Sequence, residues 1–598
     1  MALPTISYRY AFGIKTDVKE NIGFLDEQTV IYPAGSNLII YNAENKSQRF
    51  ITMTEHCESI TSLCISNTRR YCAVAERSTV EKPQVVIYDL HTLRRKKVLV
   101  PSSEIESKEY VALAFSSDAK FIITQTGAPD WMMYFWLWEK GKLMASFRTT
   151  QDKPTSNLPP PTGFKDRDAG GTINQVSFNP LDSNQICTIG NGVFRLYRYQ
   201  DGGCKQLSFS KFEPRNFTSH AWICDDRLVV GSEDGRLLIF ESTGELKIEI
   251  VYSNGTTNAP KQIYGIVAYL KGFIVAGEGG FMSVYEKEDP GLAGQVSAAA
   301  IAKELFRKTR EYSLPFDNVR VLTLAISPSE DNIICTLENS QIYTLMVTSS
   351  EMKGDEAKFN LLAQPFHHGP IIGMDICIRK PLIVTCSSDK SIRVWNYLEN
   401  TSELVKYFPE EAFSVAIHPN GLYILVGFGD KLKLMNLLID DIRPFREFTI
   451  RGCRECQFST GGQYFAAAHG NAIQLYNTWN FENIGNLKGH SGKVRTIAFT
   501  SDDSRIITAS IDGTIFEWSL RDVYGFNGIG IKKESESTVK NCSYTSVVTS
   551  PDGRSAYAVG SDKIIKEIME GQLLKQVEVD IPLTQIAISH GGKVLFAG

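Results

Sequence analysis

Two segments of this chain share one pattern of residue spacing. Each contains a histidine, an aspartate 22 residues later and a tryptophan six residues after that. The residues are His367, Asp389 and Trp395 in one segment, and His490, Asp512 and Trp518 in the other. The two histidines are 123 residues apart, which is three times 41. A spacing matched in this way indicates one supersecondary unit that recurs about every 41 residues.

Further copies of the unit can be followed along the chain by an apolar residue that ends a short strand. These anchor residues are Phe24, Ile65, Phe115, Phe178, Ile223, Ala268, Ile326, Ile376, Ile417, Phe458, Phe499, Val548 and Ile588. Tight-turn sequences follow several of them, for example Pro-Asp-Gly at residues 551–553. Gly, Asn and Pro suit such turns because they accept or preset the dihedral angles that tight hairpins need.

A repeat of this length, with histidine ahead and tryptophan at the end of a strand, is typical of a WD-type propeller blade. We therefore predict an all-β fold of two consecutive WD-repeat β-propellers. Seven anchors precede residue 350 and six follow it. The first propeller is expected to be seven-bladed over residues 1–350, and the second to be incomplete at its C-terminus over residues 351–598. Because an open ring exposes sheet edges, we expect this sequence to be the ordered part of a longer protein.

Three segments depart from the repeat. Residues 151–171 are rich in proline and predict a loop. Residues 289–312 predict a helical insertion, because Ala298, Ile301, Ala302 and Leu305 recur at helical spacing. The segment Tyr8–Ile14 is expected to supply the outer strand that closes the first ring.

The composition predicts an ordinary water-soluble chain of more than one domain. It is 43% hydrophobic and 22% charged, and its net charge of −4 gives no general electrostatic case for binding nucleic acid. No apolar run approaches the ~18 residues that cross a bilayer, and the N-terminus does not resemble a signal peptide. The scattered cysteines are expected to be buried free thiols, which is typical of proteins in a reducing compartment. A cytoplasmic protein without membrane or nucleic-acid partners is expected.

The residues that look most like catalytic groups have a structural interpretation. These are His490, Ser510, Asp512 and Trp518, with their counterparts His367, Ser387, Asp389 and Trp395. In a WD blade the indole donates a hydrogen bond, the serine hydroxyl relays it, and the histidine links to the aspartate of the tight turn. Leaving one buried member unpaired costs ~1–3 kcal/mol. We predict that these residues tie strands together.

Other motifs do not support catalysis or cofactor binding. The segment Gly489–Lys493 resembles a phosphate loop, but Val494 stands where the metal-binding hydroxyl is needed. Cys453 and Cys456 have zinc-ligand spacing but lack a second pair of ligands. An enzyme with its site in a propeller channel would need convergent ionisable residues at strand starts, and no such set is evident. No enzyme activity, metal or cofactor is predicted.

Two kinds of surface residue are candidate partner contacts. The run Arg94, Arg95, Lys96 and Lys97 could dock an acidic partner such as a tubulin tail. A solvated strand edge is the more ordinary interpretation, because lysine on an outer strand also blocks edge pairing. Loops at the rims of the propellers carry large aromatic residues, which often anchor protein partners. These are Trp131, Phe164, Trp479 and Phe481.

Several stretches resemble one known family well beyond the generic repeat. Residues 379–397 read RKPLIVTCSSDKSIRVWNY, residues 24–42 read FLDEQTVIYPAGSNLIIYN, and residues 542–568 read CSYTSVVTSPDGRSAYAVGSDKIIKEI. The chain thereby closely resembles the cilia- and flagella-associated protein 57 family of motile axonemes. That resemblance implies two N-terminal propellers followed by a coiled coil. On this resemblance, the sequence is expected to end before the family's last blade and to leave out its coiled coil.

The resemblance also implies a function. It predicts a non-catalytic axonemal scaffold, located in the cytoplasm, the cytoskeleton and the axoneme of cilia and flagella. Its implied partners are inner dynein arm heavy-chain tails, the dynein regulatory complex and proteins of the doublet microtubules. Self-association through a coiled coil outside this chain is also implied. The alternative is a cytosolic double-propeller regulator of the cytoskeleton that binds actin or serves ciliary transport.

Overall fold

In the computed structural model, strands are the only regular secondary structure of the described residues, and no helix occurs among them. The predicted all-β fold is confirmed. The structure describes residues 7–78, 82–101, 105–150, 171–200, 202–207, 213–223, 226–253, 259–287, 306–316, 318–347, 359–363, 365–522 and 529–598.

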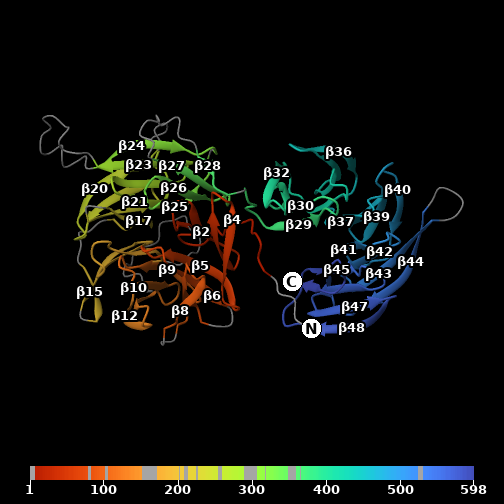
Figure 1. Ribbon diagram of the computed structural model, residues 1–598, viewed down its shortest axis with the longest axis horizontal. Coiled ribbons are helices and arrows are strands. Elements are labelled where there is room, and N and C mark those ends of the chain that lie inside the picture. The colour runs from red at the N-terminus through yellow and green to blue at the C-terminus, as the bar shows by residue number, and fades with distance from the viewer. Residues whose placement is uncertain are drawn as a thin grey trace, which may run out of the picture. The chain divides into compact units, whose positions relative to one another are not determined.

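The chain divides into two compact units, of which the first spans Tyr8–Phe366. Its described residues form seven antiparallel sheets of four strands, each in chain order (Figure 1). The strands are β1 Gly23–Phe24, β2 Thr29–Ala34, β3 Asn37–Asn42, β4 Ser47–Thr52, β5 Cys57–Ile65, β6 Tyr71–Ser78, β7 Gln84–Asp89, β8 Arg94–Leu99, β9 Tyr110–Phe115, β10 Phe121–Thr126, β11 Met132–Leu137, β12 Lys142–Arg148, β13 Ile173–Phe178, β14 Gln185–Gly190, β15 Val193–Gln200, β16 Gly203–Gln206, β17 Phe217–Ile223, β18 Arg227–Ser232, β19 Arg236–Glu241, β20 Leu246–Val251, β21 Ile263–Tyr269, β22 Gly272–Gly277, β23 Phe281–Lys287, β24 Phe306–Ser313, β25 Val321–Ile326, β26 Asn332–Leu337, β27 Ile342–Met346 and β28 Asn360–Leu361.

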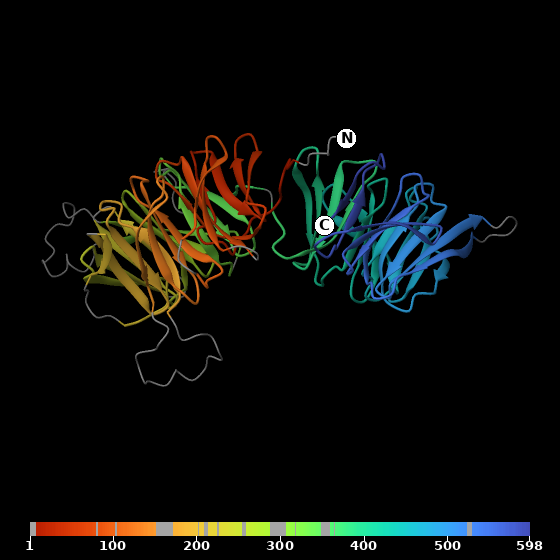
Figure 2. The same ribbon diagram turned by 90° about the horizontal axis from the view of Figure 1, so that it is seen from below.

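The sheets of the first unit form a closed ring. The first strand of each sheet lies innermost, and successive inner strands contact one another from β5 to β25. Strand β25 also contacts β1. Apolar clusters fill the space between neighbouring sheets, and one of them joins the last sheet to the first by packing Ile334 and Ile342 against Phe24 and Val30. Figure 2 shows the sheets stacked side by side in a second view.

Buried hydrogen bonds reinforce this closure. The hydroxyl of Thr336 in β26 donates to Asn21 Oδ1 at 3.0 Å, and both residues are buried. Asn21 Nδ2 in turn donates to the carbonyl oxygen of Lys15 at 3.1 Å. At the surface, the Ser329 amide and hydroxyl donate to the Glu27 carboxylate at 2.7 and 2.8 Å. The segment before β1 is therefore bonded to the last sheet of the ring.

Two predictions about the first unit are wrong. Tyr8–Ile14 is not a strand, and β28 forms the outer strand of the last sheet. Residues 306–312 of the predicted helical insertion belong to β24, which pairs with β23 along its whole length. Its pattern fits a strand because Phe306 and Tyr312 are buried at even spacing. The remainder of that insertion, residues 289–305, lies outside the described residues, as does the predicted loop except Gly171.

The second unit contains His367–Gly598. Its described residues form five four-stranded sheets and one two-stranded sheet. The strands are β29 Ile371–Ile376, β30 Leu382–Ser387, β31 Ser391–Asn396, β32 Thr401–Tyr407, β33 Ser414–Ile417, β34 Tyr423–Gly427, β35 Leu432–Leu437, β36 Ile442–Phe448, β37 Cys456–Phe458, β38 Tyr464–His469, β39 Ala472–Asn477, β40 Asn483–Leu487, β41 Val494–Phe499, β42 Arg505–Ser510, β43 Thr514–Asp522, β44 Ile529–Thr538, β45 Tyr544–Thr549, β46 Ala556–Gly560, β47 Ile564–Met569, β48 Gln572–Glu578, β49 Ile586–Ile588 and β50 Leu595–Ala597.

The sheets of the second unit are not joined into a closed ring. Apolar clusters join each sheet to the next, from the β29–β32 sheet to the β49–β50 sheet. Within the residues described, no cluster joins the last sheet back to the first. Apolar side chains of β29 are consequently exposed, with Ile371 at 57%, Met374 at 62% and Ile376 at 51%.

The predicted repeat matches the sheets closely. Each anchor residue is the last or second-last residue of the first strand in its sheet, as Ile65 is in β5 and Phe499 is in β41. The sequence predicts the boundary between the propellers near residue 350, whereas the units separate between Phe366 and His367. The difference arises because Ala363 and Phe366 pack in the apolar cluster that closes the first ring.

The closing hydrogen bonds can be tested by a double-mutant cycle. We expect Asn21→Ala to lower the free energy of unfolding by about 1–3 kcal/mol, because it leaves the buried Thr336 hydroxyl without its acceptor. Thr336→Val in the Asn21→Ala background should cost much less than in the wild type. Denaturant unfolding of the whole chain measures all four proteins. Strictly additive losses would show that the two side chains do not interact.

Candidate functional site

The predicted hydrogen-bond set of the β41–β44 sheet exists, with a different relay. Trp518 Nε1 donates to Thr508 Oγ1 at 3.1 Å, and the same oxygen lies 2.8 Å from His490 Nε2. His490 Nδ1 lies 2.8 Å from Thr514 Oγ1, which donates to Asp512 Oδ1 at 2.5 Å. A continuous chain of hydrogen bonds therefore runs from the indole to the aspartate.

The prediction that Ser510 relays this chain is wrong. Ser510 Oγ donates to the carbonyl oxygen of Lys493 at 3.0 Å, one pleat closer to the turn. Trp518 pairs directly with Ile506, so Thr508 lies diagonally opposite the indole on the same face. Side chains in that diagonal position are within reach of a large aromatic group. The relaying hydroxyl therefore belongs to the residue two positions before Ser510.

The earlier copy in the β29–β32 sheet repeats the arrangement. Trp395 Nε1 donates to Thr385 Oγ1 at 2.8 Å, and His367 Nε2 lies 2.8 Å from that oxygen. His367 Nδ1 lies 3.0 Å from Asp389 Oδ2. Ser387 does not relay here either: its hydroxyl accepts a hydrogen bond from the Asp389 amide at 3.3 Å.

The charge states agree with a structural role. Burial lowers the pKa of His367 and of His490, so both imidazoles are neutral at pH 7. Burial alone would raise the pKa of Asp389, but hydrogen bonds from His367 and Ser391 bring it below the usual range. Each neutral imidazole has partners at both ring nitrogens, and the two side chains are only 5% and 0% exposed.

The relay threonine allows a sharp test. Thr508→Val keeps the side-chain shape but leaves Trp518 Nε1 and His490 Nε2 unpaired, so we expect it to lower the free energy of unfolding by about 1–3 kcal/mol. Thr508→Ser keeps the hydroxyl and is the matched control, with a smaller loss. Denaturant unfolding of the full chain compares the three proteins. Equal stability of the valine and serine variants would contradict the relay.

The predicted aromatic contacts have different outcomes. Trp131 is only 8% exposed and packs in the apolar cluster between the third and fourth sheets, so its prediction as a surface contact is wrong. Its backbone has a positive φ of 47° directly after the turn at residues 128–130, and its indole packs in this cluster. Phe164 lies outside the described residues. Trp479 is 65% exposed and lies in the turn between β39 and β40, next to Phe481.

Phe481 belongs to a larger group, here called the aromatic patch. Its members are Tyr423, Phe445, Arg446, Trp479 and Phe481. Trp479 joins the patch through His418, whose ring centroid lies 6.3 Å from that of Trp479 and 5.9 Å from that of Tyr423. Phe445 is 52% exposed, with its ring centroid 6.2 Å from that of Tyr423 and 5.7 Å from that of Phe481. The guanidinium carbon of Arg446 lies 5.4 Å above the Phe481 ring. This combination of exposed aromatic and arginine side chains is characteristic of protein interfaces.

The basic run lies on β8, the outer strand of its sheet. Arg94, Arg95 and Lys96 are exposed and Lys97 is partly exposed. A β-bulge interrupts the pairing with β7 between Ile87 and Tyr88 and leaves Lys96 without a paired residue. These cations are thus presented at a sheet edge that faces solvent.

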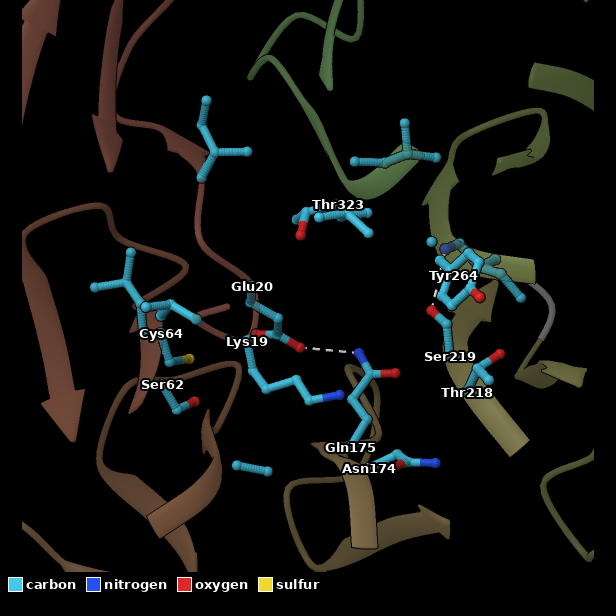
Figure 3. A pocket seen from close by; sticks show the side chains of 18 of the residues that line it. Lys19, Glu20, Ser62, Cys64, Asn174, Gln175, Thr218, Ser219, Tyr264 and Thr323 are labelled. Carbon is cyan, nitrogen blue, oxygen red and sulfur yellow. Dashed lines mark hydrogen bonds between the residues drawn. The ribbon is translucent and has the colours of Figure 1, made fainter. Parts of the chain in front are cut away.

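A cavity of about 530 Å³ lies within the first unit (Figure 3). Its wall includes residues of the inner strands β5, β13, β17, β21 and β25 together with the segment that precedes β1. Figure 3 shows Lys19 and Glu20 of that segment pointing toward Gln175 of β13. Gln175 Nε2 donates to Glu20 Oε1 at 2.9 Å. The pairing of Glu20 with Gln175 was not predicted, because the local sequence around Glu20 gives no sign that the segment before β1 enters the ring.

Most other polar groups of the wall are bonded within the protein. Asn174 Nδ2 donates to the carbonyl oxygen of Phe217 at 2.6 Å, and Thr218 Oγ1 donates to that of Ile263 at 2.5 Å. Burial raises the pKa of the Cys64 thiol to about 12, so the thiol is protonated and unreactive near pH 7. The polar groups of this wall are therefore held mainly by hydrogen bonds within the protein. None of its described residues is an activated nucleophile.

Glu20 lines this cavity and its side chain remains accessible to water, but the protein walls around it disfavour the charged carboxylate and raise the pKa of its carboxyl group to about 7. Between its ordinary pKa and pH 7 the folded chain keeps a proton that the unfolded chain loses. The free energy of unfolding should therefore fall as pH rises through this window. The same walls lower the pKa of Lys19.

Glu20→Gln tests this effect. The neutral side chain can still accept from Gln175, so we expect the variant to gain stability over the wild type as pH rises from 5.5 to 8. Thermal unfolding at several pH values measures the difference. Profiles that run parallel over this range would contradict a raised pKa for Glu20.

Metal binding and membrane-spanning helices also find no support in the described residues. The residues the structure describes contain no group of three or more His, Cys, Asp or Glu placed to hold a metal ion. That same part of the chain has no helix of the length and apolar character needed to cross a membrane.

Comparison with known proteins identifies repeats and relatives. The family model described as "WD domain, G-beta repeat" matches residues 360–396 and 481–519, which contain the two tryptophans of the hydrogen-bond sets. Cilia- and flagella-associated protein 57 of Mus musculus is 38% identical over 98% of this chain and 48% of its own length. Cilia- and flagella-associated protein 57 C of Tetrahymena thermophila is 28% identical over 99% of this chain and 50% of its own length.

A more distant relative is named for microtubules. The 77 kDa echinoderm microtubule-associated protein of Lytechinus variegatus is 22% identical over 84% of this chain and 70% of its own length. The chain spans about half the length of the ciliary relatives above. The resemblance noted in the sequence is confirmed over nearly the whole chain.

Proposed function

Because this WD-repeat chain is similar to cilia- and flagella-associated protein 57 over 98% of its length, we propose that it is a non-catalytic scaffold in the axoneme of cilia and flagella. In this role it helps to position inner dynein arms near the dynein regulatory complex and so supports ciliary motility. The similarity to ciliary proteins over both propellers is the observation that carries the proposal.

The architecture supports docking rather than catalysis. The closed first ring is held by apolar packing on both faces of its sheets, which gives a rigid support for turns and outer strands. Binding residues in proteins are commonly placed on loops that such a support positions. The mechanism of a scaffold is geometric: it holds partners at fixed places, with affinity from a few aromatic and arginine anchors.

The aromatic patch is the proposed contact of the second unit. Trp479 and Phe445 are more than half exposed, and large exposed aromatic groups lose unfavourable contact with water when a partner covers them. Arg446 adds a planar group that can donate hydrogen bonds to carboxylates while it stacks on Phe481. The proposed partners are inner dynein arm heavy-chain tails, the dynein regulatory complex and proteins of the doublet microtubules.

A second candidate function is a cytoskeletal regulator outside the axoneme. The similarity to the 77 kDa echinoderm microtubule-associated protein favours contact with microtubules over contact with actin. The two candidates differ in location. An axonemal scaffold stays with detergent-extracted cilia, whereas a cytosolic regulator is lost with the soluble fraction.

The proposal predicts a motility defect. In cells that lack the protein, we expect cilia to assemble but to beat with an altered waveform and with inner dynein arms missing. Re-expression of the wild-type protein at its own locus should restore both. Phe445→Ala/Trp479→Ala should weaken binding in extracted cilia by roughly a thousandfold, since each of the two anchors contributes ~2 kcal/mol.

Leu181→Ala/Leu270→Ala is the matched control, because both leucines are exposed, at 73% and 72%, and belong to the first unit, whereas the patch belongs to the second. Full retention of the control and loss of the patch variant would support the proposed contact. Normal beating in a verified null would refute the scaffold function itself. Normal retention of the patch variant would refute only this choice of contact.

A further inference from the structure

The cations of β8 continue onto the neighbouring sheet. Lys97 Cε and Nζ lie against Gly141, at 2.7 and 3.0 Å from the position that a Cβ would occupy there. Gly141 stands between Lys140 and Lys142, which are both exposed at the start of β12. The group of Arg94, Arg95, Lys96, Lys97, Lys140 and Lys142 is here called the basic strip. One acidic residue, Glu139, adjoins it in sequence.

The cations of the basic strip are not neutralised by neighbouring carboxylates of the described residues. No ion pair involves any of its six side chains within the residues that the structure describes. By contrast, Lys247 of β20 is 3.0 Å from Glu245, and Lys431 beside β35 is paired with Glu447 of β36. Such pairs cancel charge on those strands. The basic strip therefore keeps a local charge of opposite sign to the net −4 of the chain.

The range of this local charge is set by salt. At physiological ionic strength the screening length is about 8 Å. A bound ligand therefore senses the strip and not the distant acidic residues that make the chain acidic overall. Because the four cations of β8 are consecutive on an extended strand, they alternate between its two faces, and cations on one face recur about every 6.6 Å. An extended peptide with successive carboxylates has the same spacing.

We propose that the basic strip docks an extended acidic peptide, a run of glutamate or aspartate residues. Arg94 and Arg95 offer forked donors that fit carboxylates, and the lysines add mobile charge. The strip carries no Phe, Tyr or Trp on which a nucleobase could stack, which favours a peptide over single-stranded nucleic acid. This inference does not depend on the partners proposed for the aromatic patch.

The test is direct binding of a fluorescein-labelled peptide of twelve glutamates to the whole chain, followed by fluorescence anisotropy at 50 and 150 mM salt. The wild type should bind, and binding should weaken as salt rises. Arg94→Gln/Arg95→Gln/Lys96→Gln should weaken binding about tenfold, because exposed ion pairs contribute ~0.5 kcal/mol each. Arg94→Lys/Arg95→Lys/Lys96→Arg keeps the charge and should retain most of the binding.

The matched control removes the same charge elsewhere on the first unit. Lys46→Gln/Arg49→Gln/Lys205→Gln changes three exposed cations on or beside the outer strands β4 and β16, and should change binding less than twofold. Equal weakening by both triple variants would mean that only overall charge matters, and would overturn the proposal. So would absence of binding to the wild type, or equally tight binding of a twelve-nucleotide single-stranded DNA.

Discussion

The packing of one sheet face against the next is the interaction on which both units depend. Each apolar cluster draws its members from two neighbouring sheets, so no sheet has a core of its own. Second and third strands are buried on both faces, as Cys72–Ala75 and Val85–Ile87 illustrate. The outer strands face solvent, as β48 does throughout its length. A blade removed from its neighbours would expose two apolar faces, so stability belongs to the stack as a whole.

This constraint explains why the two units differ at their ends. In the first unit the last sheet meets the first, and the cluster around Phe24 and Ile334 removes the remaining apolar faces from water. In the second unit the described sheets leave β29 with exposed isoleucine and methionine side chains. The buried polar groups are secondary to this packing. The chain of hydrogen bonds from Trp518 through Thr508 to His490 pins strands that the apolar clusters have already brought together.

Features that depend on regular spacing could be predicted from the sequence. The partners and the burial of single side chains could not, because they depend on residues that are distant in the sequence. The anchors, the all-β fold and the aspartate-centred turns follow from a periodic pattern and from turn chemistry. The relay by Thr508 was missed because threonine inside a β-branched strand looks like an ordinary strand residue. Trp131 was misplaced because a turn can fold a large side chain inward. Residues 306–312 were read as helix because alternation over one strand is too short to outweigh the preceding helical spacing. Lys19 and Glu20 face a cavity that only the closed ring creates.

The two exposed surfaces proposed as contacts, the basic strip and the aromatic patch, differ in chemistry. A scaffold that uses them would hold its partners in two different ways. The basic strip of the first unit acts through charge, which salt screens and which speeds encounter more than it prolongs binding. The aromatic patch of the second unit acts through burial of apolar area, which moderate salt does not weaken. A partner held by the patch should therefore persist at salt concentrations that release one held by the strip. Graded salt extraction of cilia would separate the two kinds of contact, since each partner should leave at the salt concentration set by the surface that holds it.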